Sequence, residues 1–158
     1  MTARRRPRSL DRWRREHLGR LLIRAFQVFE KDMLAGLEEN GIQGLRMSHF
    51  AVLRNTEVAG SSLTEIARRA GLTKQAIGPL VHELVDAGVL EMTPDPSDGR
   101  AWLVRFTRAG AAGLHTARDV YDRVVASYAE RVGKREMREL HDHLARFVTI
   151  AEKPEQGP

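Results

Sequence analysis

The sequence predicts a mainly α fold with a small β-hairpin, in which a winged helix-turn-helix is flanked by N- and C-terminal dimerisation helices. Two short amphipathic segments meet at a tight turn around Gly71, and two short strand-like segments follow them directly. Three longer amphipathic segments lie outside this block. We therefore divide the chain into a disordered basic arm (1–8), dimerisation helices (9–40 and 107–153) and the winged helix-turn-helix itself (46–106).

Positive charge is concentrated at the N-terminus. The 158 residues carry 26 basic and 21 acidic side chains, a net charge of +5, yet residues 1–15 alone contain seven arginines and one aspartate. Such an arm is typical of a segment that contacts phosphates or another polyanion, although a solvated tail would have the same composition. The absence of cysteine excludes disulfides and cysteine-ligated metal sites. No apolar run approaches the roughly 20 residues of a membrane helix, so a cytoplasmic protein without a membrane partner is expected.

The first long helix is expected over residues 9–39. Its apolar residues recur at helical spacing: Leu18, Leu21, Leu22, Ala25, Phe26, Phe29, Met33 and Leu37. Asn40 and Gly41 should end it, because both tolerate the left-handed backbone of a helix C-terminus. A second helix is expected to follow over residues 48–60.

The two helices of the helix-turn-helix have clear boundary signals. Ser62 and Glu65 have the spacing of a capping box, in which each side chain accepts a hydrogen bond from the other residue's N–H. Gly71 should stop this helix, and Thr73 can cap the next one. The second helix has a buried face: Ile77, Leu80, Val81, Leu84 and Val85. Pro79 interrupts it, so we expect either a kink or a regular helix that starts only at Pro79.

A β-hairpin and two further helices complete the chain. Residues 89–93 and 101–107 are expected to be strands, and the turn-forming residues 94–99 join them. Thr107 can cap a long helix that Gly133 breaks, and a last amphipathic helix follows. The small central module cannot cover the apolar stripes of all three flanking helices. We therefore expect these helices to pack together and to pair with a second chain.

An outward polar row on the second helix of the pair is the candidate DNA-reading surface. It consists of Thr73, Lys74, Gln75, Gly78 and His82. A recognition helix needs side chains near its N-terminus that reach base edges and phosphates. Gln75 can read adenine, Lys74 can donate to guanine or phosphate, and Gly78 allows close backbone approach. The alternative is an ordinary solvated helix face.

The tip of the hairpin offers a second candidate contact. Arg100 at a wing tip can enter a narrow minor groove, where the negative potential is enhanced, and Asp98 could hold its guanidinium in place. The alternative is a plain loop with an exposed ion pair.

This succession resembles the MarR family of bacterial transcriptional regulators. The resemblance rests on residues 63–67, 71–76 and 84–90, and most specifically on the wing residues 95–100 followed by 106–110. It implies a homodimer that places its recognition helices in successive major grooves of double-stranded DNA. It also implies release by a small phenolic or anionic effector.

The resemblance further implies a ligand pocket between the dimerisation helices and the DNA-binding module. By position, Phe29, His49 and Phe50 are the residues expected to line it. Pro79 departs from the family pattern, which commonly has a polar or basic residue there.

Two functions compete at this point. A dimeric DNA-binding regulator, acting as a repressor, is the first; a winged-helix module that binds protein without DNA is the second. Residues 61–106 contain five basic and six acidic side chains, a net charge of −1, which favours the second unless the positive charges gather on one face. No catalytic motif stands out, so neither an enzyme nor a cofactor is predicted. Glu139 and His143 fall short of the three or four ligands that zinc needs, so no metal site is predicted either.

Overall fold

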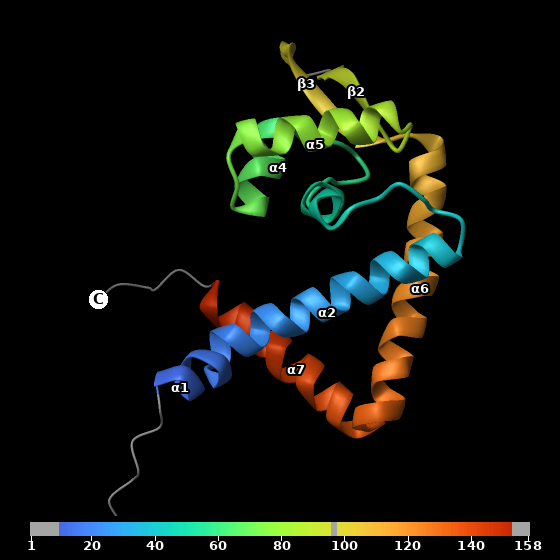
Figure 1. The fold of residues 1–158 in the computed structure, drawn as a ribbon. Coiled ribbons are helices and arrows are strands. Elements are labelled where there is room, and N and C mark those ends of the chain that lie inside the picture. Colours follow the sequence, from blue (N-terminus) through green and yellow to red (C-terminus); the bar gives the residue numbers. More distant parts are fainter. Residues whose placement is uncertain (1–9, 96–97, 153–158) are drawn as a thin grey trace, which may run out of the picture.

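The predicted fold class is confirmed: the chain is mainly helical, with a small antiparallel sheet (Figure 1). The computed structural model describes residues 10–95 and 98–152, with the backbone alone at 98–100, so the predicted arm at 1–8 lies outside the described residues. In chain order the elements are α1 (Leu10–Glu16), α2 (Leu18–Glu39), η1 (Met47–His49), α3 (Phe50–Leu53), β1 (Ser61–Ser62), α4 (Leu63–Ala70), α5 (Lys74–Asp86), β2 (Leu90–Asp95), β3 (Asp98–Phe106), α6 (Arg108–Val132) and α7 (Lys134–Ala151). None of the helices described is both long and apolar enough to cross a membrane.

The N-terminal helical region is broken at His17, so the prediction of one continuous helix over 9–39 is wrong. His17 has an extended backbone (φ −70°, ψ 151°), and its Nδ1 atom accepts a hydrogen bond from the Arg20 N–H at 3.2 Å. The histidine therefore acts as the N-cap of α2, a role that the spacing of apolar residues does not reveal. At the other end Gly41 has a φ of 85°, as the predicted stop requires.

The helix expected over 48–60 is much shorter than predicted, because α3 has only four residues. Asn55 Nδ2 donates to the Ala51 carbonyl at 2.8 Å. Thr56 Oγ1 donates to the Val52 carbonyl at 2.9 Å. Such side-chain bonds offer the carbonyls an alternative to the N–H groups that would continue the helix.

The helix-turn-helix begins at the predicted caps. Ser62 Oγ accepts a hydrogen bond from the Glu65 N–H at 3.2 Å, which starts α4. Thr73 Oγ1 accepts one from the Ala76 N–H at 3.2 Å, which starts α5. Between them Gly71 has the left-handed conformation (φ 66°) that ends α4.

Helix α5 continues through Pro79, so a regular helix that starts only at Pro79 is wrong. Pro79 has no N–H to donate to the Gln75 carbonyl, at a cost of roughly 3 kcal/mol. Packing outweighs that cost, because Ile77, Val81 and Leu84 are at most 1% exposed and each stabilises the fold by roughly 1.5–3 kcal/mol.

The sheet has three strands in the order β1-β3-β2, all antiparallel. Strand β1 is absent from the sequence prediction, because it consists of two serines with no apolar alternation. Ser61 pairs with Val104 and Ser62 with Leu103, so this strand exists only through its partner β3.

The core of the winged helix-turn-helix lies between α3, α4, α5 and the sheet. Its buried residues are Val52, Ile66, Ala67, Ile77, Val81, Leu84, Leu90, Val104 and Phe106. The predicted helical face of α5 and alternate residues of β3 meet here. The core thus fixes how α5 and the wing are presented on one side of the molecule (Figure 1).

The sheet passes into α6 without a linker. Thr107 caps α6 as predicted: its Oγ1 accepts from the Gly110 N–H at 2.9 Å and donates to the Gly88 carbonyl at 2.6 Å. A Cβ atom at Gly110 would lie 2.0 Å from the carbonyl oxygen of Val89, so only glycine permits this close approach.

Helix α2 crosses α6, which continues to α7 beyond a break at Gly133 (Figure 1). The rings of Phe29 and Tyr121 pack edge to face, with centroids 6.0 Å apart. Tyr128 donates from its hydroxyl to Asp32 Oδ2 at 2.6 Å. Burial and the Asp32 carboxylate raise the pKa of Tyr128 to about 12, so the phenol remains a donor at neutral pH.

Candidate nucleic-acid interface and effector cavity

The N-terminal half of α5 presents the predicted polar row to solvent. Lys74, Gln75 and His82 are exposed. At about 100° per residue, Gln75 and His82 each lie at least about 100° around the helix from the buried Ile77, Val81 and Leu84, whereas Lys74 is exposed as the first residue of the helix. Gly78 lies between Gln75 and His82, and no heavy atom would come within 4 Å of a Cβ atom placed there. The Thr73 hydroxyl accepts a hydrogen bond from the Ala76 N–H, so in this structure it acts as the N-cap of α5.

The wing is longer than predicted, because its strands reach Asp95 and Asp98, which pair with each other. Pro94 pairs with Trp102, so the register shifts between Pro94 and Asp95, close to the tip. Arg100 therefore lies in strand β3, beyond the boundary of the predicted turn. The side chains of Asp98 and Arg100 lie outside the described part of the structure.

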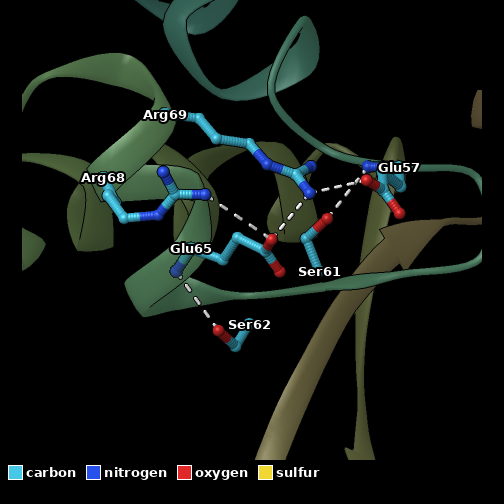
Figure 2. Close-up of polar contacts among 6 residues, drawn as sticks. All are labelled: Glu57, Ser61, Ser62, Glu65, Arg68 and Arg69. Atoms are coloured by element: carbon cyan, nitrogen blue, oxygen red, sulfur yellow. Dashed lines mark hydrogen bonds and ion pairs between the residues drawn. The ribbon is translucent and has the colours of Figure 1, made fainter. Parts of the chain in front are cut away.

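An ion-pair cluster fixes α4 to the loop before β1 (Figure 2). Arg69 Nη2 lies 2.6 Å from an oxygen of Glu57 and 2.6 Å from an oxygen of Glu65. The Glu65 carboxylate thus points to Arg69. In a capping box it would instead accept a hydrogen bond from the Ser62 N–H. That half of the predicted box is replaced by an ion pair.

Arginines neutralise much of the acidic charge of this module. Glu65 pairs with Arg69, and Glu91 lies 3.1 Å from Arg105. Glu83 accepts from Arg46, which belongs to the segment before η1. The pairs of Glu65 with Arg69 and of Glu91 with Arg105 are already contained in the net charge of −1 counted over residues 61–106, so Arg46, outside that range, is the arginine of these three that offsets it.

His49 and Arg46 hold the C-terminal half of α5 through Glu83. The His49 ring is buried, and its Nδ1 atom accepts from the Arg46 N–H at 3.1 Å. Its Nε2 atom therefore carries the proton and donates to Glu83 Oε2 at 2.8 Å. These two partners, His49 first and Arg46 second, lower the pKa of Glu83 below its ordinary value.

We expect Glu83→Gln to destabilise the protein at neutral pH, with a penalty that shrinks in acid. The pKa of Glu83 is lower in the folded state, so its stabilising contribution is complete above its ordinary pKa of about 4.5. That contribution is lost as the pH falls through the lowered value. Chemical unfolding of both chains between about pH 3 and pH 7 measures the difference. An equal penalty at every pH would contradict this prediction; Asp86→Asn, at an exposed position of α5, is the control.

A cavity of about 440 Å³ lies between the winged helix-turn-helix and helices α2 and α6. Most of its wall is apolar, and it includes Met33, Leu37, Ile42, Phe50, Phe106 and Leu114. Small residues of α6 at intervals of four, Ala109, Gly113 and Ala117, leave room for it. Among the described residues that line it, Arg54 is the one charged side chain.

Comparison with known proteins identifies this arrangement. A model of the MarR family matches residues 43–101. The HTH-type transcriptional repressor Rv2887 of Mycobacterium tuberculosis is 33% identical over 96 residues, which are 60% of this chain and 67% of that repressor. The chain belongs to the MarR family. Its sequence resemblance to that family is thereby confirmed.

Solved MarR-type structures have the same fold. The MarR family protein Rv2887 of Mycobacterium tuberculosis, in complex with salicylic acid, is 30% identical, with a TM-score of 0.63 over 83% of this chain and 96% of that chain. CouR of Rhodococcus jostii RHA1, bound to p-coumaroyl-CoA, is 26% identical, with a TM-score of 0.67 over 90% of this chain and 96% of that one. CouR bound to a 23-mer DNA duplex matches with a TM-score of 0.67 at 24% identity, over 86% of this chain and 95% of that one.

In this MarR-family chain the cavity contains only part of the predicted pocket. Phe50 lines it, whereas Phe29 packs on Tyr121 and His49 faces Glu83. Sequence reasoning missed Arg54 and the small residues of α6. The spacing of four between Ala109, Gly113 and Ala117 was the available signal for the latter.

Proposed function

We propose that this chain is a homodimeric, sequence-specific repressor of transcription that a small aromatic, anionic ligand releases from DNA. The observation that carries the proposal is the position of the cavity. It separates the module that holds α5 and the wing from α2 and α6, so a ligand there contacts both parts. Curated relatives are transcriptional repressors, which supports the same role.

Helix α5 is the proposed reader of the major groove. Gln75 would read a base edge, Lys74 a base or phosphate, and His82 would approach the backbone, while Gly78 lets the helix come close. Thr73 fixes the start of the helix. Asp98 and Arg100 belong to the wing, which we assign to the minor groove.

The proposed dimer forms through the helices of residues 9–40 and 107–153. Large apolar side chains on them are exposed in the single chain, among them Trp13, Leu21, Phe26, Leu144 and Phe147. Such a surface needs a partner, and a second copy offers the same apolar faces. The proposed repressor acts on DNA in the cytoplasm. The proposed function includes no catalytic step.

The cavity is the proposed effector site. Its apolar wall fits an aromatic ring, and Arg54 supplies one positive charge. The salicylic acid complex of Rv2887 and the p-coumaroyl-CoA complex of CouR support this ligand class.

Protection footprinting on the DNA upstream of the chain's own gene tests the proposal. We expect two protected half-sites about 10 base pairs apart, because a two-fold dimer places its recognition helices one helical turn apart. Millimolar salicylate should remove the protection. A chain that binds no duplex DNA even at low salt would overturn the proposal in favour of the protein-binding module.

A further inference from the structure

We propose that Arg54 selects the carboxylate of the ligand and that Glu30 sets how tightly this carboxylate binds, because both anions compete for one guanidinium. The inference rests on the proposed effector site and its anionic ligand, and adds to it the competition between that ligand and Glu30 for Arg54.

The cavity calls for a ligand with an apolar body and one anionic group. Arg54 is the one charged side chain among the described lining residues, and 45% of its side chain is exposed. A guanidinium pairs with a carboxylate through two parallel N–H bonds, which a neutral amide cannot match. The remaining wall offers mainly apolar contacts, so we expect discrimination between ligands of equal shape to depend on Arg54.

Two residues of α2 hold Arg54 at the edge of the cavity. Its Nη1 atom donates to Glu30 Oε1. Its Cζ atom lies 5.0 Å from the centre of the Phe26 ring, within the range of a cation–π contact. Phe26, Glu30 and the lining residue Met33 follow one another at helical spacing, so the pair lies one turn along α2 from the cavity wall.

Glu30 is the natural competitor of a bound anion. Its side chain is only 13% exposed, so its charge depends on Arg54 for neutralisation. An incoming carboxylate must either share the guanidinium with Glu30, against the repulsion of like charges, or displace it. In both cases the Glu30–Arg54 pair weakens, and the affinity for the ligand is lower than Arg54 alone would provide.

The weakened pair is also a mechanical link. Arg54 is the C-cap of α3 in the winged helix-turn-helix, whereas Glu30 belongs to α2. The pair therefore joins the DNA-binding module to a dimerisation helix across the edge of the cavity. A carboxylate loosens this link by competition, while a neutral ligand of the same shape leaves it intact.

Calorimetric titration without DNA tests the inference, with salicylate and the neutral salicylamide as probes. The parent should bind salicylate at least about tenfold more tightly than salicylamide, the range of one charge-assisted hydrogen bond. Arg54→Gln should abolish this preference. Glu30→Gln should strengthen salicylate binding about two- to fivefold without changing salicylamide binding, because the glutamine no longer competes as an anion. Glu38→Gln removes the same charge from an exposed position of α2 and should change neither affinity.

The test separates a specific effect from a folding defect. The affinity for salicylate should fall in Arg54→Gln and rise in Glu30→Gln, whereas a folding defect would lower it in both. A parent that binds both probes equally, or a Glu30→Gln chain that binds salicylate no better, overturns this inference and leaves the proposed repressor intact. A parent that binds neither probe overturns the effector site as well. A parent protein that shows these ligand affinities but binds no duplex DNA in the footprinting experiment would contradict the proposed function. It would not contradict this inference, because the titration contains no DNA.

Discussion

Replacing Lys74 and Gln75 together with alanine is expected to abolish sequence-specific DNA binding while leaving the protein folded. Both side chains are exposed at the start of α5, and alanine is a better helix former than either. Each lost base contact costs roughly 1–3 kcal/mol, and a dimer loses every contact twice. We therefore expect specific affinity to fall at least about thirtyfold for a single contact residue and further for both.

Gel-shift titrations at fixed salt, on the footprinted site and on a scrambled duplex, separate the two roles. Gln75→Ala should reduce the ratio between specific and non-specific affinity. Lys74→Ala should weaken binding to both duplexes, because a phosphate contact carries no sequence information. Lys134→Ala is a matched control, because it removes one positive charge from the start of α7. Unchanged specificity in the double variant would show that α5 does not read the bases.

Replacing Leu144 and Phe147 with glutamate is expected to convert the protein into a monomer that no longer binds its operator. Phe147 is 55% exposed and Leu144 38% exposed in the single chain. Burial of one such side chain stabilises an association by roughly 1.5–3 kcal/mol, and a two-fold interface contains each twice. Because about half of the Phe147 side chain is still exposed in the single chain, the dimerisation constant should fall at least about tenfold for Phe147→Glu alone.

Sedimentation equilibrium at micromolar concentration measures this effect. Thr149→Glu introduces the same charge at an exposed position on another side of α7 and should leave the dimer intact. A double variant that still sediments as a dimer would contradict the assignment of these helices. Far-ultraviolet circular dichroism should remain nearly unchanged, because neither side chain belongs to the described core.

Local signals predicted most of the fold, because its boundaries depend on single residues. Thr73, Gly71 and Thr107 mark helix ends through a hydroxyl or a positive φ, and each acts where the sequence places it. The sequence prediction is wrong where an element depends on a partner distant in the sequence or on an unusual capping residue. Strand β1 depends on β3 for its hydrogen bonds, and His17 caps α2 with a ring nitrogen in place of a hydroxyl.

The candidate sites divide in the same way. Most of the polar row of α5 could be predicted, because helical spacing separates Gln75 and His82 from the buried Ile77. The cavity could not, because its wall combines α2, α3, β3 and α6, and only the packed structure shows that Arg54 reaches it. The position of His49 along the chain predicts that it lines the pocket, yet its buried ring donates a hydrogen bond to Glu83.

Gly110 and Val89 are in close contact at the base of the wing, so we expect the wing to follow a tilt of α6. The backbone of Gly110 lies directly against the Val89 carbonyl, just before β2, and α6 has 25 residues, a length of about 37 Å. In the proposed dimer, a tilt of about 10° around the far end of α6 shifts the wing by about 6 Å, nearly two base-pair steps. A tilt of α6 thus changes the distance between the two wings, and the angle between the two α6 helices of the proposed dimer sets the spacing of the half-sites that it can bind.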